Sequence, residues 1–165
     1  MRHGTEHDDQ PVEETDGAFL LRHVRVPDAE TEAWRDDVLA LGGRLRAVYG
    51  NAVQLEPTLA TYRVGHDVTV SCSAQDAPLH TVCFAALVSD GPELARNWRS
   101  VLREGHHCQL AWLACDQKGR LGAFYELPFA AACGPFLQAG VTAVGRAARS
   151  VRRNLGLADQ LLDAA

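Results

Sequence analysis

The sequence has no run of about 18 apolar residues, so it offers no candidate for a transmembrane helix. Its first residues, Met1 to Asp9, are polar and acidic and lack the apolar core of a secretory signal. Lysine is almost missing, because Lys118 is the one lysine among 16 basic residues. The first two absences predict a soluble cytoplasmic protein with no membrane segment, whereas the scarcity of lysine predicts nothing about the fold.

Cysteine is present, but not in a pattern that builds a structural site. The five cysteines are an odd number, and no two of them form a C-x-x-C pair. This argues against both a disulfide framework and a zinc ribbon. We expect small core residues in a reducing compartment, because free cysteine is among the most buried residue types. The five are Cys72, Cys83, Cys108, Cys115 and Cys133.

The short motifs that mark common enzymes are also missing. The sequence contains no G-x-S-x-G elbow, P-loop, H-E-x-x-H or G-x-G-x-x-G pattern. It therefore predicts no catalytic residue, no cofactor and no metal. Two alternatives stay open. His106, His107, Cys108 and Cys115 have the ligand types of a zinc site, although alternation along a strand would separate them. An enzyme site of unrecognised type would combine His80, His106 and Cys108.

Charge is divided unevenly along the chain. Residues 1–37 hold 11 acidic and 4 basic residues, whereas residues 38–165 hold 10 acidic and 12 basic residues. Residues 1–17 are acidic and contain almost no aliphatic side chain, a composition typical of disorder. We predict a disordered acidic tail over residues 1–17 and one folded domain over residues 18–165, a length that suits a single core.

The first half of the domain predicts a helix and then strands. The helix is expected from Asp28 to Gly50, with a kink or an early end at Gly42-Gly43. Four strand-like segments follow, and the last, Leu79 to Val88, is apolar enough to be central. In the third segment valines and Cys72 alternate with Thr and Ser, which predicts one buried side. The helix stripe is Trp34, Val38, Leu41, Leu45 and Val48, and the first three strands are 53–56, 59–64 and 68–73.

The second half predicts a helix, a hairpin and a longer helix. The middle helix is expected to end at Gly105. The two strands of the hairpin should be residues 107–115 and 120–127. Gly134-Pro135 begins the last helix, which has the clearest helical period in the chain. The buried stripes are Leu94, Trp98, Val101 and Leu102 in the middle helix, and Leu137, Val141, Val144, Ala148, Val151 and Leu155 in the last. The fold class is therefore α+β, with helices packed on an antiparallel sheet.

The element order α-βββ-α-ββ-α resembles the type III secretion chaperone-like fold and the related YbjN-like proteins. Residues 79–150 carry this resemblance: an apolar strand leads to a helix with Leu94, Asn97 and Trp98, a hairpin ends at Glu126-Leu127-Pro128, and an amphipathic helix follows. The resemblance implies a small cytoplasmic homodimer without catalytic residues, which presents apolar surface to a partner polypeptide.

The resemblance also makes the middle helix the dimer contact, with Trp98, Val101 and Leu102 as interface candidates. The competing interpretation is that these three are ordinary core residues. The leading functional hypothesis is thus a chaperone-like or adaptor-like protein-binding module.

The last helix is predicted to carry a basic face. Arg146, Arg149 and Arg153 are spaced by three and four residues, and residues 129–157 contain no acid. The face could bind phosphates, as in an accessory factor of a DNA repair or replication protein. It could also be a solvated face favoured by the negative end of the helix dipole. A third possibility is that the acidic N-terminal region folds back on it.

Overall fold

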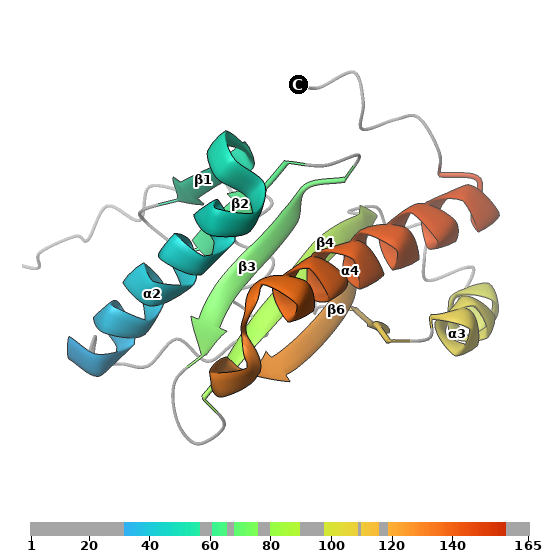
Figure 1. Cartoon of the computed structure of the whole chain (residues 1–165). Helices are drawn as coiled ribbons and strands as arrows, with labels where there is room; N and C mark the ends of the chain where they lie inside the picture. Colours follow the sequence, from blue (N-terminus) through green and yellow to red (C-terminus); the bar gives the residue numbers. More distant parts are fainter. Residues whose placement is uncertain are drawn as a thin grey trace, which may run out of the picture.

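The computed structural model describes residues 32–56, 61–65, 68–75, 80–89, 98–108, 110–115 and 119–157, apart from the side chains of 32–34 and 107. The predicted acidic tail, the first turns of the first helix and the start of the middle helix lie outside these residues. Within them, six strands form one sheet and helices pack on it (Figure 1). This confirms the predicted α+β class.

The strands form a mixed-length antiparallel sheet with the order β1-β2-β3-β4-β6-β5. β4 lies between β3 and β6, which confirms that the most apolar segment is central. The predicted hairpin is also confirmed, because Cys115 pairs with Leu121 across the turn. The strands are β1 (Val53–Glu56), β2 (Thr61–Val64), β3 (Val70–Gln75), β4 (Thr81–Ser89), β5 (Trp112–Cys115) and β6 (Leu121–Pro128).

Two helices, α2 (Glu32–Tyr49) and α4 (Gly134–Asn154), lie side by side on one face of the sheet (Figure 1). α2 packs over β1 to β3, and α4 packs over β3, β4 and β6. A single large core fills the space between helices and sheet, with Phe84 at its centre. Five of the six residues in the predicted α4 stripe are buried, namely Leu137, Val141, Val144, Ala148 and Val151. The sixth, Leu155, is half-buried.

The expected kink or end at Gly42-Gly43 is wrong, because α2 runs unbroken through both glycines. Gly42 is there for a different reason, since a Cβ at this position would lie 2.2 Å from the Tyr62 hydroxyl. The glycine lets the helix pack closely on the buried ring of β2. The helix ends at Tyr49, and Gly50 adopts a positive φ of 57° in the 3₁₀ turn η1 (Gly50–Ala52).

The expectation of a solvent-facing side on β3 is also wrong. Ser71 and Ser73 are as buried as the valines that they alternate with. They lie on the sheet face opposite to α2 and α4, where Cys83, Ala85 and Phe124 form a second, smaller apolar cluster. Ser71 pairs with Ala85 and Ser73 pairs with Cys83, and all four side chains are buried. The serine hydroxyls of β3 therefore did not indicate an exposed side of the strand.

The middle helix, α3 (Trp98–His107), departs most from expectation. It passes Gly105, so His106 and His107 are helical and the following strand begins only at Trp112. Of the predicted buried stripe, Val101 is buried in the main core but Trp98 and Leu102 are exposed, and Leu94 lies outside the described residues. In the described part of the chain α3 contacts mainly β5 and α4, and these contacts leave the side that carries Trp98 and Leu102 exposed.

Candidate protein-binding surface

Four large apolar side chains are exposed on two neighbouring elements. Trp98 and Leu102 lie one turn apart on α3, Trp112 is the first residue of β5, and Leu110 lies two residues before it. Their exposed fractions are 56%, 59%, 60% and 44%, respectively. Because α3 packs against β5, we refer to these four residues together as the α3–β5 apolar surface, which wraps around the β5 edge: Leu110 lies on the α4 side, and Trp112 lies over Phe124 on the opposite sheet face. Exposed apolar groups that gather in this way mark interaction sites more often than scattered ones do.

Both tryptophans of the α3–β5 apolar surface are held by neighbours. The Trp112 ring stacks on buried Phe124, with the ring centroids 6.3 Å apart and the planes 21° from parallel. The Arg99 guanidinium lies 5.6 Å from the centroid of the Trp98 ring. Rings held in one orientation lose little conformational entropy on binding, which is what an interface anchor requires.

A groove of about 630 Å³ lies beside this surface, between α4 and the segment that joins α3 to β5. Its lining is mainly small or apolar, and among the described residues that line it Arg146 is the charged one. The lining residues are Cys108, Leu110, Ala111, Pro135, Gln138, Ala139, Thr142, Ala143, Arg146, Ala147 and Ser150. We call this site the α4 groove.

The arginines of α4 have different surroundings. Arg146 and Arg153 are exposed and Arg149 is half-buried, so the predicted basic face has one well-defined site, where Arg146 lines the α4 groove. Arg152 instead donates hydrogen bonds to the carbonyl oxygens of Leu87 and Val88 at the end of β4. Its charge therefore serves the contact between α4 and the sheet.

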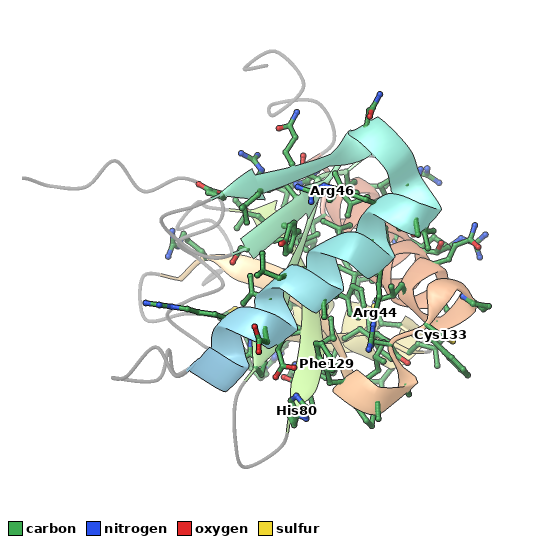
Figure 2. All side chains as sticks on the ribbon, turned by 60° about the vertical axis from the view of Figure 1, so that its left-hand side comes forward. Arg44, Arg46, His80, Phe129 and Cys133 are labelled. Atoms are coloured by element: carbon green, nitrogen blue, oxygen red, sulfur yellow. The ribbon has the colours of Figure 1, made fainter. Side chains whose placement is uncertain are left out.

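His80 lies at a corner that sequence reasoning missed (Figure 2). Its Nε2 is 2.6 Å from Oδ2 of Asp37, and its ring stacks on Phe129 with centroids 4.9 Å apart. Arg44 lies 4.7 Å from the Phe129 centroid and donates hydrogen bonds to the carbonyl oxygens of Phe129 and Ala132. These contacts tie α2 to the corner between β6 and α4, which is a structural role.

The Cys108 thiol has the wrong electrostatics for nucleophilic chemistry. Burial and then the nearby Glu104 raise the pKa of the Cys108 thiol, which also donates a hydrogen bond to the Glu104 carbonyl oxygen. A catalytic cysteine needs the opposite shift, towards the thiolate. In the described part of the chain, no three His, Cys, Asp or Glu side chains lie close enough to hold a metal ion. The open alternatives built on His106 and Cys108 therefore gain no support from the geometry.

The expectation that the cysteines are core residues is right for two of them and wrong for two. Cys72 and Cys83 are buried, Cys108 is half-buried, and Cys115 and Cys133 are exposed. Burial raises the pKa of the Cys72 thiol, with a smaller contribution from Cys83. Burial, and then Glu126, raises the pKa of Cys83 to about 12.

These environments predict which thiols react in the folded protein. With Ellman's reagent at pH 8, the exposed thiols of Cys115 and Cys133 should react at once. Cys72 and Cys83 should react only after unfolding, because the protonated thiols of these two residues are enclosed in the core. The absorbance time course counts the thiols, and mass spectrometry of alkylated peptides assigns them. Rapid labelling of Cys72 in the folded chain would contradict this arrangement of the core.

Comparison with solved structures identifies the class of fold. A chain of the HopA1–SchA chaperone–effector complex aligns with a TM-score of 0.55 at 14% identity, over 72% of this chain and 97% of that chain. The Yersinia pestis type III secretion chaperone SycH, solved with a stable fragment of YscM2, aligns with a TM-score of 0.51 at 13% identity, over 69% of this chain and 98% of that chain. A chain of the ExsC–ExsE complex aligns with a TM-score of 0.52 at 17% identity, over 72% of this chain and 92% of that chain.

The protein therefore has the type III secretion chaperone-like fold, as its element order predicted. No protein-family model and no curated protein sequence matches the chain. Among the described helices, none is both long enough and apolar enough to cross a membrane.

Proposed function

We propose that the protein is a non-catalytic, chaperone-like or adaptor-like module that acts as a cytoplasmic homodimer and binds a partner polypeptide. We further propose that it belongs with the YbjN-like relatives of the secretion chaperones. The observation that carries the proposal is the α3–β5 apolar surface. Trp98 and Leu102 belong to the helical stripe expected in the core, yet both face outward.

The fold neighbours support a protein-binding role. Two of them are a chaperone–effector complex and a secretion chaperone bound to a protein fragment, and the third is a complex of two proteins. In our proposal Trp98 and Leu102 form the dimer contact, and buried Val101 supports them from beneath. Leu110, Trp112 and the sheet edge at β5 then remain for a partner.

Partner capture tests the proposal. A tagged full-length chain, expressed in its native host, should recover at least one specific protein that mass spectrometry identifies. Trp112→Asp should reduce recovery at least 10-fold, because a charge would have to be buried in the interface. Leu39→Asp is the matched control, since Leu39 is 68% exposed on α2 and lies outside the α3–β5 apolar surface. Equal recovery with both variants would reject the proposed surface.

A role in nucleic-acid binding is not favoured by the contacts of α4. Arg152 is engaged with the carbonyl groups of β4 and Arg149 is half-buried, so the exposed arginines of α4 are Arg146 and Arg153. Binding through so few phosphate contacts would be weak and would fall steeply with salt.

A further inference from the structure

The α4 groove lies next to α3, and the proposed function assigns no contact to it. On α4 its lining forms one row from Pro135 to Ser150, which is about 22 Å long at a rise of 1.5 Å per residue. The exposed side chains of this row are mostly small, as at Ala139 and Thr142, so a second helix can approach α4 closely. The groove therefore has the length and the lining that a short helix requires.

The charges beside the groove do not select a charged ligand. Arg146 lines the groove, and Glu104 lies beside it, because the Glu104 carbonyl oxygen accepts the hydrogen bond from the groove-lining thiol of Cys108. Arg146 and Glu104 have opposite signs, so together they give no preference for an acidic or a basic peptide. The apolar part of the lining therefore decides what binds, and it favours an apolar occupant.

A projecting helix lies beside this groove in the same chain. α3 is ten residues long, about 15 Å, and Trp98 and Leu102 project from its exposed side. Leu110 follows α3 closely in the chain and lines the groove, so the projecting helix and the hollow are neighbours. A two-fold interface joins one patch to the same patch of a second copy, so the patch must be complementary to itself. A helix that projects next to a groove of matching length meets this requirement.

The proposed dimer contact also requires more surface than α3 alone supplies. Trp98 and Leu102 together expose roughly 250 Å², whereas a stable interface buries about 800 Å² on each partner. The contact must therefore extend onto neighbouring surface. Leu110 joins α3 to the groove through continuous apolar surface, whereas Trp112 lies around the β5 edge on the opposite sheet face.

We propose that α3 of each copy lies in the α4 groove of the other, with Trp98 and Leu102 against Ala139. This inference rests on the proposed homodimer and names the surface that receives α3. It moves Leu110 into the dimer contact, and it leaves Trp112 and the β5 edge to the partner polypeptide.

A mixture of two charged variants tests this contact between chains. Ala139→Asp places a carboxylate in the groove and Leu102→Lys places an ammonium on α3, both at exposed positions, so each variant should fold. Alone, each variant should self-associate at least 10-fold more weakly than the unmodified chain, because its charge meets apolar surface twice in the dimer. Mixed in equal amounts, the two should form mainly heterodimer, in which the new ammonium of one chain meets the new carboxylate of the other. Sedimentation velocity measures the association, and native mass spectrometry counts the homodimers and heterodimers.

The matched control is Ala40→Asp, the same change at an exposed position of α2 outside the groove, and it should associate as the unmodified chain does. If Ala139→Asp also associated like the unmodified chain, the groove assignment would be overturned, and an effect of Leu102→Lys alone would leave the α3 dimer standing. A mixture without an excess of heterodimer would likewise overturn the groove assignment. An unmodified chain that stayed monomeric from 1 to 100 µM would overturn the homodimer and this inference together.

Discussion

Alanine at position 42 is expected to destabilise the protein by about 2 kcal/mol or more, although alanine is the better helix former. The new Cβ would lie 2.2 Å from the hydroxyl and 2.3 Å from Cζ of Tyr62. That ring is 1% exposed and belongs to the main core, so it has little room to move. Overpacking a close-packed core costs about 1–3 kcal/mol and sometimes more. Urea denaturation measures the loss as a fall in the free energy of unfolding.

The neighbouring glycine provides the matched control. A Cβ at Gly43 would meet no atom within 4 Å, and this position is exposed on the same helix. Gly43→Ala should therefore stabilise the protein by about 0.5–1 kcal/mol through helix propensity alone. If the two substitutions changed stability in the same direction and by the same amount, the packing of α2 on Tyr62 would be wrong.

Aspartate at Trp98 and Leu102 together is expected to weaken self-association at least 100-fold. Each substitution removes an aromatic or aliphatic anchor and would place a carboxylate in a desolvated contact, and loss of such anchors typically costs 2 kcal/mol or more. Sedimentation equilibrium over a concentration series gives the dimer Kd of the variant and of the unmodified chain. The stability of the monomer should change little, because both side chains are exposed in it.

Leu39→Asp separates this effect from a general loss of surface hydrophobicity. Leu39 is the most exposed large apolar residue in the described part of the chain, but it lies on α2. We expect the Leu39→Asp chain to associate as strongly as the unmodified chain. Equal weakening by Leu39→Asp and by the α3 variant would remove the case for α3 as the dimer contact.

Sequence patterns correctly predicted the helices and strands that pack against a large part of the rest of the domain. The start of α4 at Gly134 was predicted correctly, and its buried stripe was recognisable because one face of the helix meets a whole sheet, so that its apolar period is unbroken from Leu137 to Val151. A nearly continuous apolar run located β4, and a short polar segment ending in a glycine located the hairpin turn at Gly119, where φ is 79°. Gly42 was read as a break because its partner, Tyr62, is 20 residues away and cannot be recognised locally.

The candidate surface was predictable only in part. The period of α3 identified Trp98 and Leu102 as a pair on one face, but a period does not say whether that face meets the protein's own core or a partner. No local pattern predicted Leu110 and Trp112, because Leu110 precedes β5 and lines the α4 groove, whereas Trp112 stacks on Phe124 on the opposite sheet face. The contact of His80 with Asp37 joins residues 43 positions apart, and no local pattern announces it.

The central claim is that this fold exposes apolar surface because it works as a dimer that binds protein. Sedimentation velocity of the unmodified full-length chain from 1 to 100 µM tests it most directly. We expect a species of twice the 17.9 kDa monomer mass to dominate over this range. A single species of monomer mass at every concentration would contradict the account.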